Sequence, residues 1–142
     1  MEAAITHFLD YAATNPSAII QYKASDIILH IDSDESYLSE PRARSRTGGH
    51  YYLSSLPTDP KKTPNLPPPA NGPIHTEWRI FKHVVVSAAE SEVGGLFHNG
   101  QTAVPLRITL HELGFTQPPT VVKLTKPCWS RVRSLGLNFI VL

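Results

Sequence analysis

The segment Asp26-Ile-Ile-Leu-His-Ile-Asp-Ser-Asp-Glu35 decides the fold class of this chain of 142 residues. Its β-branched and leucine-rich part, through Ile31, is typical of a buried strand, and an acidic group follows directly. His30, Asp32 and Asp34 stand at alternate positions. Because a strand directs such residues to one face, we expect them to line up at the strand end as possible ligands of a divalent cation. A solvated turn is the other interpretation.

Three further strands and three helices are predicted around this segment. Strands are expected over His50–Ser54, Ile74–Val86 and Thr120–Leu124, and a helix over Ala3–Ala13. The turn-forming Gly48-Gly49 is expected to precede the second strand.

Two consecutive helices are predicted in the second half of the chain. Ser87 followed by Glu90 is a capping-box signature that starts a helix at Ala88, which we expect to end near Asn99-Gly100. A second helix is expected from Thr102 to Leu113, with Pro105 in its first turn and Gly114 at a left-handed C-terminal position. Three neighbouring strands then pair antiparallel, and the fourth adds in parallel through a crossover, which predicts a mixed α/β sheet with flanking helices.

The composition argues against a strongly basic protein, a disulfide-stabilised protein and a membrane-spanning protein. The net charge of +1 gives no global attraction to nucleic acid or to an acidic membrane, and Cys128 is the only cysteine. No apolar run approaches the roughly 20 residues of a membrane span. We expect an intracellular chain, in the cytoplasm or the nucleus, that is monomeric and has no membrane partner.

The stretch 57–73 holds seven prolines and is expected to be a loop. Its PxxP spacings would also suit a ligand of polyproline-recognition modules, although surface loops of this composition are commoner.

Four side chains outside the first strand segment are candidates for chemistry. Glu92 is expected at the edge of the buried stripe of its helix, where a carboxylate is costly unless it is paired or bound to a cation. Arg42, Arg44 and Arg46 form a basic stretch before Gly48-Gly49 that could contact phosphates or simply solubilise a loop.

Two segments together resemble a known family. Ile31-Asp-Ser-Asp-Glu-Ser-Tyr-Leu-Ser-Glu-Pro-Arg-Ala-Arg-Ser-Arg-Thr-Gly-Gly-His50 and Ser87-Ala-Ala-Glu-Ser-Glu-Val-Gly-Gly-Leu96 are similar to parts of the ribonuclease H domain that ends copia-type retrotransposon polyproteins. Phe8-Leu-Asp-Tyr-Ala12 resembles the connector that precedes that domain, and the likeness covers about residues 5 to 123.

This resemblance implies a fold, an activity and a set of ligands. The fold is a ribonuclease H-like mixed sheet, and the activity is hydrolysis of the RNA strand of an RNA–DNA hybrid with two Mg²⁺ ions held by acidic residues. Asp34 matches the first family aspartate. Glu92 matches the family glutamate, with Glu90 as the alternative. The implied division is a connector helix over 1–22, the domain over 23–124, and an aberrant tail over 125–142.

The resemblance stops at Lys123. The family continues with Thr-Asp-Asn, whereas this chain has Leu124-Thr125-Lys126, and no aspartate or glutamate follows Glu112. Lys-Leu-Thr-Lys can be encoded as AAA-CTG-ACA-AAR, and reading two bases further gives Thr-Asp-Lys. A frameshift or a mispredicted splice would therefore account for the tail. We expect an incomplete, inactive nuclease, or alternatively a non-enzymatic module that binds nucleic acid or protein.

Overall fold

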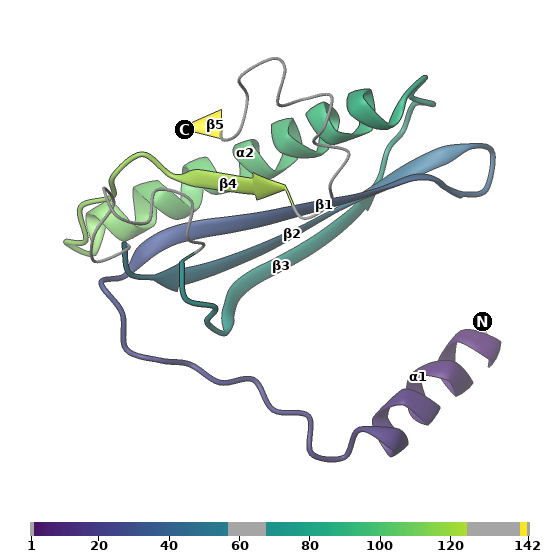
Figure 1. Cartoon of the computed structure of the whole chain (residues 1–142), viewed down its shortest axis with the longest axis horizontal. Helices are drawn as coiled ribbons and strands as arrows, with labels where there is room; N and C mark the ends of the chain where they lie inside the picture. The colour runs from purple at the N-terminus through teal and green to yellow at the C-terminus, as the bar shows by residue number, and fades with distance from the viewer. Residues whose placement is uncertain (1, 57–67, 125–139, 142) are drawn as a thin grey trace.

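The computed structural model describes residues 2–56, 68–124 and 140–141. Its elements are α1 (Glu2–Thr14), β1 (Ile28–Glu40), β2 (Arg44–Ser54), β3 (Pro73–Ile80), α2 (Ala88–Glu112), β4 (Val121–Leu124) and β5 (Ile140–Val141). The strands form one open sheet in the order β3-β2-β1-β4-β5, and α2 packs on one face of it (Figure 1). β1 is parallel to β4, and the other pairs are antiparallel. The predicted mixed α/β sheet with a parallel fourth strand is confirmed.

β1 is longer than predicted and contains the whole acidic group. The strand predicted over 26–31 starts at Ile28 and continues to pair with β2 through Ser36 opposite Arg46, so the alternative interpretation of the acidic group as a solvated turn was wrong. Since the backbone groups of the acidic segment find partners in β2, its polar side chains do not end the strand. The carboxylates therefore lie along the sheet and not in a turn beyond it.

The turn between β1 and β2 lies earlier than the sequence indicated. Gly48 and Gly49 are inside β2, opposite Asp34 and Ser33, so the prediction of a turn there was wrong. The reversal occurs at 41–43, where Arg42 has a φ of 64° and Ala43 a φ of 53°. β3 also ends at Ile80 and not at Val86.

One continuous helix replaces the two that were predicted. α2 begins at Ala88 as expected, and the Oγ of its N-cap Ser87 accepts a hydrogen bond from Glu90 N at 3.1 Å. The Glu90 carboxylate reaches back to Val86 N, at 2.7 Å. At the other end Gly114 has the expected left-handed conformation, with a φ of 91°. Pro105 lies inside the helix and not in a first turn.

The apolar core lies between the sheet and the C-terminal half of α2. It consists of Leu29, Ile31, Tyr51, Ala103, Leu110 and Val122. The start of β1 is held by Gln117, whose Oε1 accepts from Leu29 N at 2.9 Å and whose Nε2 donates to Ile27 O at 2.9 Å. This clamp holds a residue with an unfavourable positive φ of 58°, Ile27, at the entry to the sheet.

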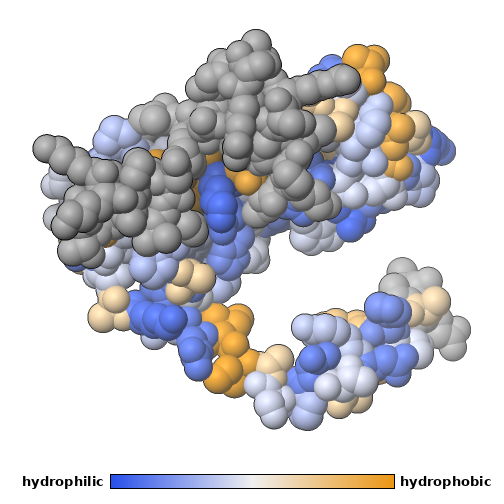
Figure 2. Space-filling model, viewed as in Figure 1, coloured by the Kyte–Doolittle hydropathy of each residue, from blue (hydrophilic) through white to orange (hydrophobic). Residues whose placement is uncertain are grey.

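Helix α1 confirms the predicted N-terminal helix and stands apart from the sheet (Figures 1 and 2). All of its side chains that the structure describes are exposed. Ile19 and Ile20 in the connecting segment are also exposed. No helix in the described part of the chain combines the length and the apolar character needed to cross a membrane.

Candidate functional site

The side chains of β1 alternate between two environments. Leu29, Ile31, Ser33 and Glu35 point to the inner face, which α2 covers, and His30, Asp32 and Asp34 point to the opposite face, called here the second face. The three candidate ligands are thus on one face, as the alternation predicted. Within the described part of the chain, however, no three His, Cys, Asp or Glu side chains converge on a point that could hold a metal ion.

A polar network lies at the inner face between β1 and the middle of α2. Asn99 is 1 % exposed, and its Nδ2 donates to Ser33 Oγ at 2.6 Å and to Gly48 O at 3.1 Å. Ser33 Oγ in turn donates to Glu35 Oε1 at 2.7 Å, and Thr47 Oγ1 donates to the same oxygen at 3.4 Å. One helical amide thus connects the Ser33 hydroxyl of β1, which holds the Glu35 carboxylate, with a backbone carbonyl of β2.

The network continues across the sheet to β3. The Tyr51 hydroxyl lies 3.1 Å from Asn99 Oδ1 and 2.8 Å from Glu77 Oε1. Thr102 Oγ1 donates to the same Glu77 oxygen at 2.7 Å. Burial alone would raise the pKa of Glu77, but the hydrogen bonds from Thr102, Tyr51 and Arg79 outweigh it, so this pKa is lowered. Glu77 is therefore a charged anchor of the fold.

Gly95 makes room for the Glu35 side chain beneath α2. A Cβ atom at Gly95 would stand 1.8 Å from Glu35 Oε1, closer than any non-bonded contact allows. The helix and the strand approach each other closely at this point because the helical residue has no side chain. The absence of a side chain at Gly95 thus places a carboxylate in a largely enclosed position.

Three carboxylates gather where β1 meets the N-terminal half of α2. Burial above all, together with the negative charges of Glu92 and Asp34, raises the pKa of Glu35 to about 7 against the opposing hydrogen bonds from Ser33 and Thr47. Burial also raises the pKa of Glu92. The carboxyl of Glu35 therefore interacts electrostatically with that of Asp34, which is exposed, and with that of Glu92, which is partly buried like Glu35 itself. Asp34 and Glu92 are the carboxylates that the resemblance singled out.

The parallel strand β4 contributes no acidic side chain to this group of carboxylates. Its register sets Leu124 opposite Ser33, directly before the position of Asp34 along β1. Leu124 is 8 % exposed and belongs to the buried apolar residues. Carboxylate oxygens are the ligands that Mg²⁺ prefers, and two ions held close together need several of them. The described residues do not fit a two-ion site.

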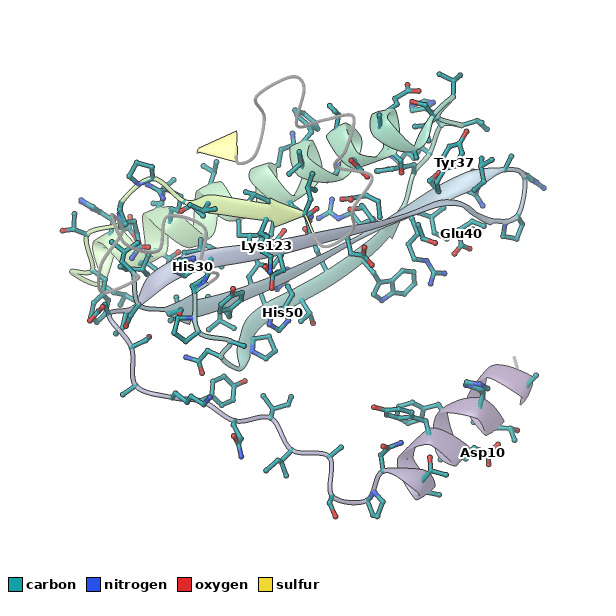
Figure 3. The ribbon with its side chains drawn as sticks, viewed as in Figure 1. Asp10, His30, Tyr37, Glu40, His50 and Lys123 are labelled. Carbon is teal, nitrogen blue, oxygen red and sulfur yellow. The ribbon has the colours of Figure 1, made fainter. Side chains whose placement is uncertain are left out.

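The second face carries a separate group around Asp32. His50 is opposite Asp32 on β2, and Lys123 is opposite it on β4. Burial raises the pKa of Asp32, whereas Lys123 and His50 act in the other direction. Figure 3 shows His30, His50 and Lys123 in the central part of the sheet, and His30 stacks on Tyr52 with ring centres 5.7 Å apart. Burial lowers the pKa of His30, which favours a neutral imidazole.

The three candidate arginines lie at the β1–β2 hairpin. Arg42 is in the turn, and Arg44 and Arg46 are in β2 and not in a loop, as the sequence had suggested. Arg46 forms an ion pair with Glu40 at 2.5 Å, and its guanidinium carbon lies 5.1 Å from the ring centre of Trp78. Figure 3 places Glu40 and Tyr37 near this end of the sheet. The exposed aromatic side chain of Trp78, on β3, thus lies beside the basic stretch.

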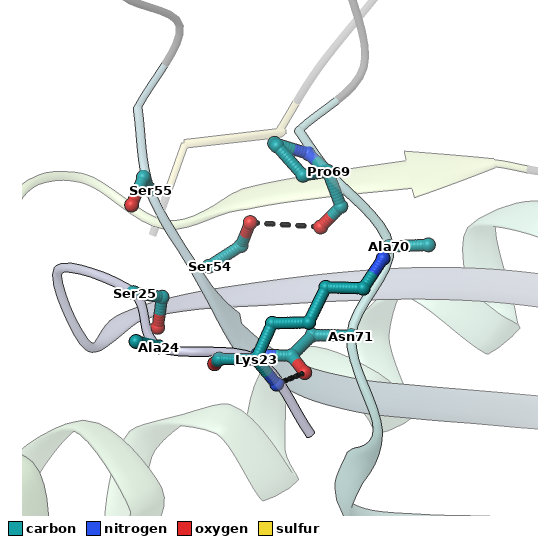
Figure 4. A pocket seen from close by; sticks show the side chains of 8 residues that line it. All are labelled: Lys23, Ala24, Ser25, Ser54, Ser55, Pro69, Ala70 and Asn71. Atoms are coloured by element: carbon teal, nitrogen blue, oxygen red, sulfur yellow. Dashed lines mark hydrogen bonds between the residues drawn. The ribbon is translucent and has the colours of Figure 1, made fainter. Parts of the chain in front are cut away.

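A small pocket lies at the other end of the sheet (Figure 4). Its lining contains Lys23 as the single ionisable side chain. Lys23 N donates to Asn71 Oδ1 at 2.8 Å, and Ser54 Oγ donates to Pro69 O at 2.8 Å. The first bond joins the segment before β1 to the segment before β3, and the second joins the end of β2 to that same segment. The lining has the character of a structural junction and offers no catalytic group.

Comparison with protein-family models, with curated proteins and with solved structures finds no match for this chain. The resemblance to ribonuclease H domains therefore stands on the two quoted motifs and on the acids within them.

Sequence reasoning missed Glu35 and Asn99. Glu35 follows Leu29, Ile31 and Ser33 at steps of two, so continuing the strand by four residues would have placed it on the buried face. Asn99 was interpreted as part of a helix end. Its place one turn from Gly95 and two turns from Ser91, both small, was the available signal of a close helix–sheet contact.

Proposed function

We propose that this chain is a ribonuclease H-like domain derived from a copia-type retrotransposon polyprotein, and that it does not cleave RNA–DNA hybrids. The observation that carries the proposal is the meeting of β1, α2 and β4. The first two elements set Asp34 and Glu92 close enough to Glu35 for both negative charges to act on its carboxyl, Asp34 as its neighbour along β1 and Glu92 from α2. β4 ends beside β1 with Leu124, close to the position at which the family has its next aspartate.

The arrangement supports weak binding of a single Mg²⁺ ion. Burial and, to a smaller extent, the negative charges of Glu92 and Asp34 raise the pKa of Glu35, and a divalent cation beside these carboxylates would relieve their repulsion. Two ions at the spacing required for hydrolysis would lack ligands on the β4 side. Asp34 and Glu92 are accordingly proposed as ligands of one ion, without a catalytic role in the present chain.

A cleavage assay tests the absence of activity. An RNA–DNA hybrid incubated with the chain and Mg²⁺ or Mn²⁺ should remain intact. Robust cleavage by the wild type that disappears in Asp34→Asn would overturn the proposal, because it would show a working site built on that carboxylate. Cleavage that persists in Asp34→Asn would indicate a contaminating nuclease.

A binding assay tests the ion site independently of catalysis. Mn²⁺ should broaden the backbone amide resonances of residues near Asp34 and Glu92, and the Glu92→Gln variant should lose this broadening. Glu90→Gln is the matched control, because Glu90 belongs to the helix cap and should leave the broadening unchanged. Equal loss in both variants would argue against a specific site.

A non-enzymatic nucleic-acid-binding module is the second candidate function. It is favoured by Trp78, which is 68 % exposed beside Arg46 and offers a surface on which a base can stack. Binding of an RNA–DNA hybrid should weaken as salt rises and should be lost when Arg42, Arg44 and Arg46 are all replaced by Gln. Binding that survives this replacement would dismiss the candidate.

A further inference from the structure

The outward side of α2 carries an apolar row that the sheet does not cover. Val93, Phe97, Val104 and Ile108 are between 50 % and 63 % exposed. With 3.6 residues per turn, their positions fall within an arc of roughly 60° along the helix. These four residues are called the outer row. Four large apolar side chains in a single line are typical of a helix that has a partner on that side.

A second apolar stripe without a partner lies on α1. Ile5, Phe8 and Leu9 share one side of this helix and are 54 %, 67 % and 58 % exposed. α1 has 13 residues, and an isolated helix of that length is only marginally stable in water. A surface that buries this stripe would therefore stabilise α1. The outer row has the matching chemistry.

The chain's own α2 is a poor partner for α1. Tyr22 Oη donates to Pro73 O at 2.9 Å, and Lys23 and Asn71 exchange two hydrogen bonds, which fasten the linker at the β3 side of the sheet (Figure 4). The seven residues left, 15–21, reach at most about 24 Å. The path around β3 and over α2 is about as long, from strand spacing and helix diameter. No length remains for the turn that would lay α1 along α2.

We propose that two copies of the chain form a two-fold dimer in which α1 of each copy lies on the outer row of α2 of the other. Each exposed side chain contributes on the order of 100 Å². With both reciprocal contacts counted, the interface buries roughly 1,400 Å², which is within the range of stable protein–protein interfaces. This replaces the monomer expected from the sequence, and it does not depend on the proposed nuclease ancestry.

Molar mass in solution tests the dimer. The full chain should elute at twice its monomer mass in size-exclusion chromatography with light scattering. Phe8→Glu and Phe97→Glu should each reduce this to the monomer mass, with a loss of helical circular dichroism no larger than the contribution of α1. Val86→Glu is the matched control: Val86 is 86 % exposed and lies outside both stripes, so this variant should remain dimeric. A wild type that is monomeric up to its solubility limit overturns the proposal.

Cross-linking tests which helix occupies the outer row. In a Cys128→Ser background, a mixture of Phe8→Cys and Phe97→Cys chains should oxidise to a mixed dimer. A chain that carries both cysteines should not close on itself at monomer mass, and closure would overturn the exchange between copies. A dimer that survives Phe8→Glu but not Phe97→Glu would mean that the outer rows pair with each other, which also contradicts α1 as the occupant.

Discussion

The two sides of helix α2 reverse the usual arrangement of a surface helix. Over most of its length the side toward the sheet presents small and polar buried residues, namely Ser91, Gly95, Asn99 and Ala103, and the large apolar Leu110 is buried only near the C-terminal end. The opposite side presents the outer row, in which every member is at least half exposed. Burial in this helix therefore does not follow hydrophobicity, and the difference has a physical origin on each side.

On the inner side, close approach and hydrogen bonding replace apolar contact in the N-terminal half of the helix. Gly95 allows the Glu35 side chain beneath the helix, and Asn99 satisfies polar groups of both β1 and β2. A buried network of this kind is favourable only while its members keep their partners. On the outer side, no close contact with the sheet limits the size of the side chains. The large apolar residues of the outer row fit there and stay accessible to a partner.

The largest effect is expected from Asn99→Leu. This change keeps the volume similar but leaves Ser33 Oγ, Gly48 O and the Tyr51 hydroxyl without the amide. Each buried group that loses its partner costs about 1–3 kcal/mol, so the free energy of unfolding should fall by roughly 3–4 kcal/mol. Urea denaturation followed by circular dichroism measures this. A loss below about 1 kcal/mol would mean that the network contributes little to the inner contact.

Gly95→Ala should have the next largest effect. The new methyl group would collide with Glu35, whose carboxylate must then leave Ser33 and Thr47. We expect a net loss of roughly 2 kcal/mol, because the clash outweighs the gain in helix propensity of about 1 kcal/mol.

A double-mutant cycle makes the Gly95 test specific. In a Glu35→Ala background the collision is removed, so the same substitution should become neutral or stabilising. An equal cost of Gly95→Ala in both backgrounds would show that the close approach to Glu35 is not the reason for the glycine.

The pH dependence of stability isolates the carboxylate of Glu35. Its pKa is raised from 4.5 to about 7 in the fold, so the folded chain holds a proton that the unfolded chain releases. The free energy of unfolding should therefore fall as pH rises from about 4.5 to about 7, and this contribution should be constant above that. Complete burial would make the loss about 3 kcal/mol, and solvent screening reduces it to roughly 1–2 kcal/mol.

Glu35→Gln should remove this dependence. The variant should be more stable than the wild type by roughly 1–2 kcal/mol at pH 8 and similar to it at pH 4, because glutamine resembles the protonated carboxyl. Denaturation at several pH values measures the difference. A variant with the same pH profile as the wild type would assign the dependence to other carboxyls, Glu92 first.

The sequence predicted the sheet topology well because that depends on element order. Three neighbouring strands, an intervening helix and a β-branched strand at 120–124 leave few arrangements other than the one observed. The first and last residues of the strands and helices were predicted less well, because they depend on tertiary contacts. β1 includes the acidic residues because they pair with β2. α2 continues past Asn99, where the sequence suggested a helix end, and Asn99 is bonded to the sheet at this point.

The candidate site was predictable only in part, for the same reason. Asp34 and Glu92 were available from the resemblance, and the structure sets both near Glu35. Glu35 itself became apparent only once β1 was known to continue, because a residue after a strand has no assigned face. Whether these carboxylates bind a cation remains a prediction for the experiments above.

The smallest effect is expected on the outer side of α2, from Val104→Gln. Val104 is 50 % exposed, whereas its neighbour Ala103 is fully buried in the core. At protein concentrations too low for association, Val104→Gln should change the free energy of unfolding by no more than about 0.5 kcal/mol. Ala103→Gln, the same side chain one position earlier, should cost about 3 kcal/mol or more because it overfills the contact with β1. A loss above about 1.5 kcal/mol for Val104→Gln in dilute solution would mean that the outer row is covered within one chain, which would remove both the contrast between the two sides and the surface offered to a second copy.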